Sequence, residues 1–204
     1  MKNRCCIFIV FLFLLSCQSG SKKKTVECVL IKELTKLEQL YLLPFDSIMN
    51  VCDLSNDSIV DFPDLSAYSI KTLDLSDNLL DTIIPCFLPK RLEKLNLSHN
   101  RYSGWLKIEE HTFSSLKELD MSYNQLIRIL ILDPLYRIIV SHNDLVEVDI
   151  NHKNIQYLDI SYNVNMSENV TFFPLWIDTI IREGVANGKP LINPNAPGFI
   201  MYCE

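Results

Sequence analysis

The sequence predicts an α/β protein built as a solenoid, in which short coils stack on one another and each coil carries one short strand. An eleven-residue pattern, Leu-x-x-Leu-x-Leu-x-x-Asn-x-Leu, occurs six times, with start-to-start spacings of 21, 22, 24, 19 and 20 residues. Positions four and six are apolar between polar neighbours, as in a strand with one buried face. One coil cannot bury its apolar side alone, so the copies must stack into a continuous core. They begin at Met49, Ile70, Leu92, Leu116, Leu135 and Ile155.

The ninth position of the pattern is an asparagine in five of the six copies. The chain must turn away from the strand at this point, and an amide offers two donors and an acceptor to the backbone of that turn and of the next coil. We therefore expect a ladder of stacked amides, made of Asn78, Asn100, Asn124, Asn143 and Asn163. The first copy has Asp57 instead, which accepts but cannot donate and is best tolerated at an end of the ladder.

Six copies of this pattern at this period resemble the leucine-rich repeat. The resemblance implies a right-handed solenoid with a parallel β-sheet on its concave side. Spacings of 19 to 24 residues leave about 8 to 13 residues for the return path, which favours tight turns and short 3₁₀ pieces on the convex side. The return segment 83–89 contains two prolines, in agreement with that. The short and uneven repeats are more similar to bacterial members than to helix-backed animal ones.

The two ends of a solenoid need caps, because the first and last coils would otherwise expose core. We assign residues 26–204 to one repeat domain, with an N-terminal cap at 26–48, six repeats at 49–169, and a C-terminal cap and tail at 170–204. Residues 26–43 have apolar residues at helical spacing and predict a helical cap. Residues 172–181 are densely apolar and predict a helix that ends near Gly184 or Gly188. The tail from Pro190 is expected to be irregular chain folded back on that cap.

The N-terminus has the features of an export signal. A short basic region, Met1–Arg4, precedes an uninterrupted apolar run to Leu15, which is too short to span a bilayer as a helix. The following Leu14-Leu15-Ser16-Cys17 resembles the bacterial lipoprotein cleavage box. The resemblance implies a signal peptide at 1–16, cleavage after Ser16, a lipid on Cys17, and a polar tether at 17–25. The alternative is an ordinary signal peptide in which Cys17 is incidental.

Composition fits an exported, folded, acidic protein. Hydrophobic residues make up 48% of the 204 residues, enough to bury a core. Removal of the signal takes away Lys2 and Arg4 and leaves 17 basic against 25 acidic residues, a formal charge of −8. Such a surface argues against nucleic acid as the ligand and leaves basic peptides, proteins or cations as partners.

Four of the seven cysteines lie outside the signal region: Cys28, Cys52, Cys86 and Cys203. Cys52 occupies an inward repeat position and is expected to be buried. A disulfide between Cys28 and Cys52 would join the cap to the first repeat, since export permits disulfides, but the sequence leaves every pairing open. There is no Cys-x-x-Cys or Cys/His metal spacing, and we predict no metal and no cofactor.

The candidate binding residues are outward strand positions, compared column by column. The fifth column is mostly aspartate, the seventh is serine in every copy, and the eighth gives Asn56, Asp77, His99, Tyr123, His142 and Tyr162. Small serines would form a shallow trough between carboxylates and rings, in which a basic peptide pairs with the carboxylates and stacks on the tyrosines. The alternative is that the Asp and Ser columns are stacking chemistry internal to such repeats. The predicted binding residues are Asp74, Asp120, Asp159, His99, Tyr123, His142 and Tyr162.

The sequence lacks the motifs of the common catalytic sites, including a Gly-rich phosphate loop, a Gly-x-Ser-x-Gly elbow and a His-Glu-x-x-His helix. We therefore predict a non-catalytic protein- or peptide-binding lipoprotein on the bacterial cell envelope, at the outer membrane or cell surface. One alternative is an enzyme whose site lies in residues 172–204, with the repeats as substrate grip. Another is a passive spacer. A third is a eukaryotic secreted protein, in which Asn165 and Asn169 would be glycan acceptors.

Overall fold

The computed structural model describes residues 33–113, 115–150, 154–166, 177–185 and 199–200. Its contacts divide the chain into Met1–Glu33 and a compact second unit, Leu34–Glu204. The second unit is the solenoid that the repeats predict. Cys17 and the expected signal peptide and tether lie outside the described residues, as does the 26–32 part of the expected cap helix.

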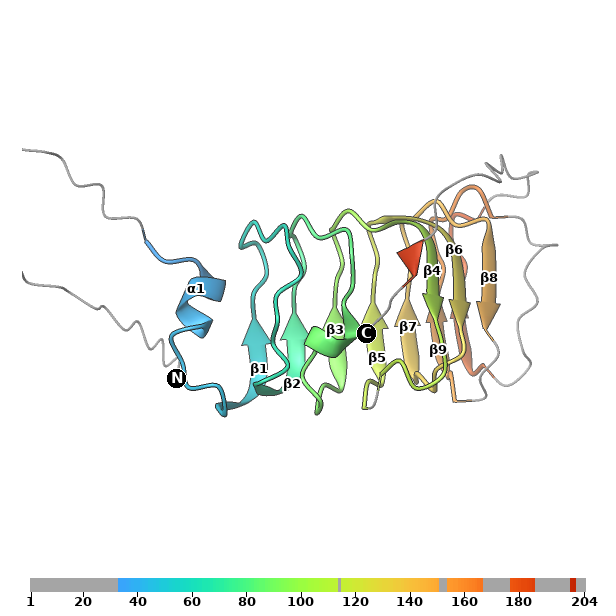
Figure 1. Cartoon of the computed structure of the whole chain (residues 1–204). Helices are drawn as coiled ribbons and strands as arrows, with labels where there is room; N and C mark the ends of the chain where they lie inside the picture. The colour runs from blue at the N-terminus through green and yellow to red at the C-terminus, as the bar shows by residue number, and fades with distance from the viewer. Residues whose placement is uncertain (1–32, 114, 151–153, 167–176, 186–198, 201–204) are drawn as a thin grey trace, which may run out of the picture. The chain divides into compact units, whose positions relative to one another are not determined.

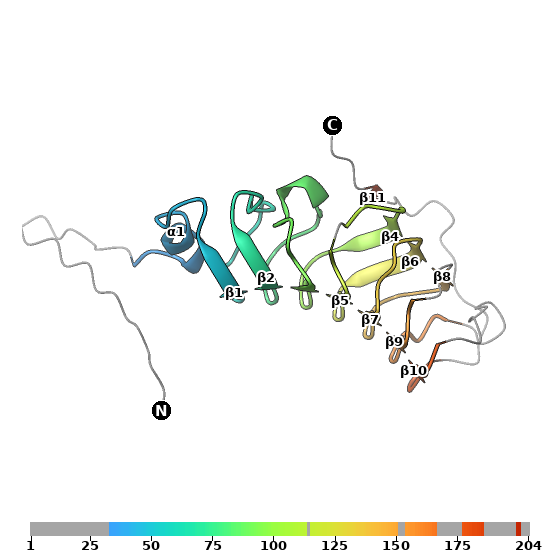
Figure 2. The same cartoon turned by 90° about the horizontal axis from the view of Figure 1, so that it is seen from below.

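Seven parallel strands form the main sheet, one per coil (Figure 1). The sheet curves along its length, with the repeat strands on the inner side of the curve (Figure 2). The fourth pattern positions stand in register across it, so that Cys52 pairs with Leu73 and Leu73 with Leu95. In sheet order the strands are β1 (Ile48–Asp53), β2 (Ser69–Asp74), β3 (Lys94–Asn96), β5 (Glu118–Asp120), β7 (Arg137–Ile139), β9 (Tyr157–Asp159) and β10 (Thr179–Ile181).

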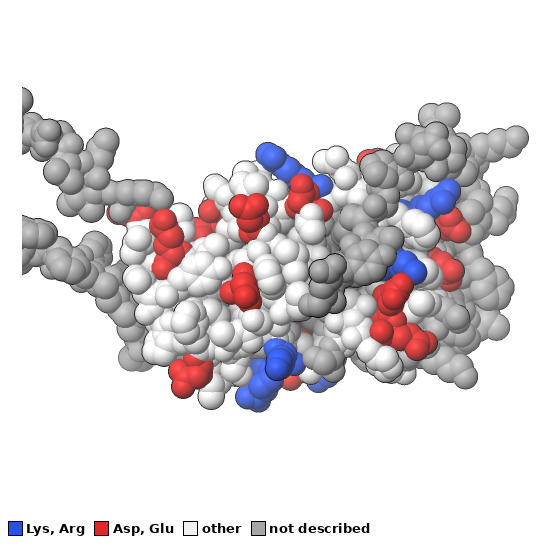
Figure 3. Space-filling model, in the orientation of Figure 1, with Lys and Arg blue, Asp and Glu red and all other residues white. Residues whose placement is uncertain are grey.

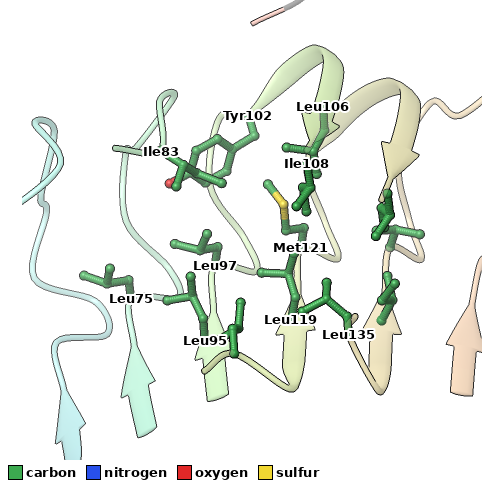
Figure 4. Close-up of a cluster of buried hydrophobic side chains, with 14 of the residues drawn as sticks. Leu75, Ile83, Leu95, Leu97, Tyr102, Leu106, Ile108, Leu119, Met121 and Leu135 are labelled. Carbon is green, nitrogen blue, oxygen red and sulfur yellow. The ribbon is translucent and has the colours of Figure 1, made fainter. Parts of the chain in front are cut away.

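The core is the continuous interior between this sheet and the return segments. The fourth and sixth positions of every repeat are buried, and side chains of successive coils interlock (Figure 4). Tyr102 fills an eleventh position that is aliphatic in four of the other five repeats, and it is completely buried. Burial raises the pKa of the Tyr102 hydroxyl well above the usual value. The apolar positions of the repeat pattern are therefore the positions that form the core.

The predicted amide ladder is confirmed. All five asparagines are buried, and Asn100 shows the common arrangement. Its Nδ2 donates to the backbone oxygens of Leu75 in the preceding coil and of Leu97 and Ser98 in its own, at 3.0 to 3.1 Å. Its Oδ1 accepts from the N–H of Leu80 at 3.0 Å. Each amide thus joins two coils through groups that would otherwise be unpaired in the core.

The described part of the N-terminal cap, residues 33–48, contains one short helix, α1 (Lys36–Leu40). Thr35 begins it with a capping box, since its Oγ1 accepts from the N–H of Glu38 while the Glu38 carboxylate accepts from the N–H of Thr35. The carboxylate of Asp57 accepts from the N–H groups of Lys36 and Leu37, both at 2.8 Å. Asp57, which replaces the asparagine of the amide ladder in the first repeat, thus binds the first turn of the cap helix.

Among the described residues, the convex side has one 3₁₀ helix and a second parallel sheet, which we call the convex sheet. The predicted 3₁₀ type is confirmed at η1 (Pro85–Phe87). The later return segments differ from the expected turns and 3₁₀ pieces, because they form strands: β4 (Ser103–Ile108), β6 (Gln125–Ile131) and β8 (Glu147–Ile150). The reason is composition. The early returns contain prolines, which cannot donate to a ladder, whereas residues 125–131 read Gln-Leu-Ile-Arg-Ile-Leu-Ile, rich in β-formers.

The C-terminal end differs from the expectation. Residues 177–185 form no helix; they contain β10, which adds a seventh coil. Ile177 and Ile180 occupy the first and fourth pattern positions, and Gly184 the eighth, with φ +69°. The described part of the tail, β11 (Phe199–Ile200), pairs with β4 in the convex sheet rather than with the cap. Residues 167–176 and 186–198 lie outside the described part.

Candidate functional site

The eighth pattern position lies just beyond the carboxyl end of each main-sheet strand. Its residue has a left-handed backbone in all six repeats, with φ between 51° and 55°: Asn56, Asp77, His99, Tyr123, His142 and Tyr162. The N–H at this position donates to the next coil, for example from Tyr123 to the backbone oxygen of Ser141 at 3.0 Å. A left-handed backbone disfavours most residues other than Gly, Asn, Asp and His. The two tyrosines at such positions are therefore unusual.

These four rings form one continuous stack, which we call the ring ladder. His99 and Tyr123 stack with centroids 4.1 Å apart and planes inclined by 11°. Tyr123 and His142 follow at 4.1 Å and 10°, and His142 and Tyr162 at 4.4 Å and 14°. Tyr123 and Tyr162 are 46% and 40% exposed. Because each inner ring has a neighbour on both faces, the ladder presents ring edges to solvent, with a phenol hydroxyl or imidazole nitrogens on each rung.

The ladder ends at the seventh coil. A Cβ on Gly184 would lie 2.8 Å from Cδ1 of Tyr162, so the glycine backbone packs closely against the last ring. A hydrogen bond with Glu183 raises the pKa of the Tyr162 hydroxyl. At the other end, Asp77 occupies the same position in the coil before His99.

The fifth-position aspartates are tied into the fold. Oδ1 of Asp74 accepts from both the N–H and the hydroxyl of Ser76, at 2.9 and 2.6 Å. Asp120 and Asp159 make the same pair of bonds to Ser122 and Ser161. These serines are buried. The prediction that the serines form an open trough is therefore wrong. Each Asp–Ser pair instead stabilises the turn of its own repeat by hydrogen bonds.

Asp53, in the first repeat, is more exposed than the other fifth-position aspartates. Its Oδ1 accepts from the N–H and hydroxyl of Ser55 and from Nζ of Lys36, at 2.6 to 2.9 Å. The Ser55 bonds, followed by that to Lys36, lower the Asp53 pKa to about 2. Lys36 also donates to the backbone oxygen of Ser55. This carboxylate is therefore occupied by the cap.

The second and third positions of the repeat pattern also carry charged side chains, which are not among the predicted binding residues. Lys94 and Glu118 form a 2.8 Å ion pair on adjacent strands. The Arg137 guanidinium lies 3.7 Å from the centroid of the Tyr157 ring, a cation–π contact. In the second column, Glu93 lies between Lys71 and Lys117, at 3.9 and 3.0 Å. This alternation of basic and acidic side chains is visible in the sequence when the second and third pattern positions are compared from one repeat to the next.

A shallow hollow of about 250 Å³ lies over the middle of the main sheet. Its lining includes basic, acidic and apolar groups: Asp74, Lys94, Glu118, Asp120, Arg137 and Ile139. Two of the predicted binding residues, Asp74 and Asp120, thus come together here with the Lys94–Glu118 pair. On the face drawn in Figure 3, acidic side chains are spread along the solenoid, while basic ones gather at a few places.

Three further observations concern other kinds of site. In the described ranges, no three His, Cys, Asp or Glu side chains are grouped so as to hold a metal ion. The helical segments of the same ranges include none with the length and apolarity to cross a bilayer. Cys52 is buried and Cys86 exposed, and neither forms a disulfide there. Cys28 and Cys203 lie outside the described residues.

Comparisons with known proteins agree with this geometry. The family model for the leucine-rich repeat matches residues 69–90 and 115–138. Among solved structures, the chain is similar to YopM from Yersinia enterocolitica WA-314, with 26% identity and a TM-score of 0.50. The match covers 65% of this chain and 32% of the YopM chain, so this chain spans about a third of that protein's length. No curated protein matches the sequence. The chain contains leucine-rich repeats and folds as a leucine-rich-repeat solenoid.

Proposed function

We propose that this leucine-rich-repeat protein is a non-catalytic protein- or peptide-binding module of the bacterial cell envelope, held on the membrane by a lipid on Cys17. The ring ladder is the observation that carries the binding role. Four aromatic side chains lie in a row at the edge of the main sheet, and two of them are 40% or more exposed. Leucine-rich-repeat solenoids are typically protein-interaction scaffolds, which agrees with this role.

The geometry also restricts how a ligand is recognised. Ring faces inside the ladder are covered by neighbouring rings, so stacking of a ligand on the tyrosines, as the sequence suggested, is replaced by hydrogen bonds to the ring edges. The ring centroids of neighbouring rungs are 4.1 to 4.4 Å apart, slightly less than the usual strand spacing of about 4.8 Å. A peptide that lies along the ladder therefore meets a donor or acceptor at each coil. Tyrosine is enriched in protein interfaces because it combines a large apolar body with a polar tip.

A basic ligand remains our preferred partner. The mature chain is expected to have a formal charge of −8. Asp120 and Asp159 end their strands three residues before the ladder rings of the same coils, and Asp74 ends a strand in the coil next to that of His99. Their Oδ1 atoms serve the Asp–Ser turns, so we assign them a supporting, electrostatic role. The rings are proposed as the principal contacts.

The anchor rests on the sequence alone, and mass spectrometry tests it. The native N-terminal peptide should begin at Cys17 and carry a mass increase that corresponds to acyl chains. A peptide that begins elsewhere, or an unmodified Cys17, would remove the anchor from the proposal while leaving the binding role intact.

Substitution tests the binding role. A partner captured on the immobilised mature chain would be identified, and its affinity compared for Tyr123→Ala, Tyr162→Ala and the matched control Trp105→Ala. Trp105 is 41% exposed on β4, in the convex sheet. Interface tyrosines contribute about 1–2 kcal/mol or more, so each ladder variant should weaken binding about tenfold. Equal losses for all three variants would refute the assigned edge, and no loss for any would favour a passive spacer.

A further inference from the structure

Five exposed apolar side chains follow one another closely in the sequence, from the turn after α1 into β1. We call this set the N-terminal apolar surface and define it as Leu42, Leu43, Phe45, Ile48 and Val51. Phe45 is 68% exposed, Ile48 76% and Val51 64%. Single exposed apolar side chains are normal, but several within ten residues of one another indicate a surface that contacts something else.

The surface is held in place by the fold. The Phe45 ring lies 6.1 Å from the ring of buried Tyr68, whose hydroxyl donates to the backbone oxygen of Leu40. Ile48 and Val51 belong to β1, which is at the edge of the main sheet in the described part of the chain. Met49 and Cys52 of the same strand point into the core. The apolar groups are therefore presented by a fixed scaffold.

We infer that the N-terminal apolar surface rests on the lipid bilayer that holds the Cys17 anchor. This inference rests on the anchor in the proposed function. Only fifteen residues lie between Cys17 and Glu33, which limits the reach between the two to about 55 Å. The surface begins nine residues after Glu33, so it belongs to the end of the solenoid nearest the anchor in the sequence.

The charges at this end indicate how it meets a membrane. Lys36 is the one basic residue in the stretch 33–60, and its ammonium is bound to Asp53 and Ser55. No basic cluster in this stretch can therefore attract anionic headgroups. Contact depends on Phe45, Ile48 and Leu42 entering the interfacial region, as apolar side chains of peripheral proteins do. In such a contact, the α1 end of the solenoid would face the membrane, and the ring ladder on the later coils would remain accessible to a partner.

Vesicle binding by the mature chain from Gln18, prepared without lipid, tests the inference. The chain should float with phosphatidylcholine vesicles, and Phe45→Asp and Ile48→Asp should each lower the partition coefficient about tenfold. Val60→Asp is the matched control, since Val60 is 57% exposed on the return segment, and it should change little. Added phosphatidylglycerol should not increase binding. Urea midpoints close to that of the unsubstituted chain would show that the variants fold, and Phe45→Ser provides a milder second test.

Three results would overturn the inference. One is no binding by the unsubstituted chain, or binding that neither surface variant reduces. Another is binding that rises with phosphatidylglycerol and falls with salt, which would assign it to the lysines at 22–24. The last is a dimer that Phe45→Asp dissociates in the absence of vesicle binding, which would assign the surface to a second copy of the chain. Failure here is distinct from failure of the anchor, which the mass of the N-terminal peptide reports.

Discussion

The carboxylate of Asp57 accepts a hydrogen bond from the backbone N–H of Leu37 at 2.8 Å, and its second oxygen accepts from that of Lys36. In the later repeats the same position is an asparagine whose Nδ2 donates to carbonyls of the preceding coil, as Asn78 does to Leu54. In the part of the chain that the structure describes, which begins at residue 33, no coil precedes the first repeat. Its neighbour is the first turn of α1, whose backbone N–H groups need acceptors. The carboxylate of Asp57 accepts from two of them, whereas the NH2 group of an asparagine at this position would face other donors.

Removal of this cap should loosen the N-terminal end. Asp57→Ala loses both acceptors and should lower the free energy of unfolding by about 1–2 kcal/mol, while Asp57→Asn keeps one acceptor and should cost less. Urea denaturation measures both values. Asp61→Ala, at an exposed position, should stay within about 0.5 kcal/mol of the unsubstituted protein. A loss for Asp57→Ala no greater than this would show that the cap contributes nothing.

The amide ladder should contribute more per residue. Asn124 donates to the backbone oxygens of Leu97, Met121 and Ser122 and accepts from the N–H of Tyr102, at 3.0 to 3.1 Å. Asn124→Ala should lower the free energy of unfolding by about 2–4 kcal/mol, because several buried backbone groups lose their partner. Gln125→Ala is the control, because Gln125 is the next residue along the chain and its side chain is exposed. Equal urea midpoints for the two variants would contradict the ladder.

The ring ladder should be visible as coupling between neighbouring rungs. A double-mutant cycle with Tyr123→Ala and His142→Ala should give an interaction free energy of about 0.5–1.5 kcal/mol, the range for stacked aromatic pairs. His99 with Tyr162 is the control pair, because two rungs lie between them, and it should be additive. Additive effects in the adjacent pair as well would show that the rings do not stack in solution.

The thiol of Cys52 should be protected from reaction, unlike that of Cys86. Burial, followed by the charge of Asp53, raises the Cys52 pKa to about 11, so the folded chain keeps this thiol protonated at pH 8. Iodoacetamide should modify the Cys86 peptide and leave the Cys52 peptide unmodified until the chain is unfolded. Above the unfolded pKa of about 8.5, the unfolded state binds fewer protons, so this group lowers stability as pH rises toward 11. Equal labelling of both peptides at pH 8 would contradict the burial.

Periodic features were predictable from the sequence, because each coil repeats the demands of the one before it. The registers of Leu73 and Leu95, and the amides of Asn100 and Asn124, follow from the pattern alone. The seventh coil was missed because Arg182 replaces the apolar sixth residue and Val185 the asparagine. Two of its pattern positions, Ile177 and Ile180, were nevertheless visible at a spacing of 22 residues from Ile155 and Leu158.

The candidate site was predictable in its residues but not in its geometry. The eighth column with His99 and Tyr123 was identified, yet the stacking depends on a left-handed backbone that residue type disfavours at Tyr123. The aspartate column was identified too, but its bonds to Ser76 and Ser122 depend on turn geometry. The binding role of all seven predicted residues stays a prediction. The strands of the convex sheet were missed because the residues that pair in them follow no sequence pattern common to the repeats, and the pairing of β4 with β6 contains a register shift.

Hydrogen exchange of the mature chain with and without its captured partner tests the central claim most directly. The bound partner should slow amide exchange in residues 118–124 and 137–142, which contain strands of the main sheet and two ladder rungs. Exchange in residues 103–108 and 125–131 of the convex sheet should be unchanged. Protection confined to the convex strands, with no change at Tyr123 and His142, would contradict the account.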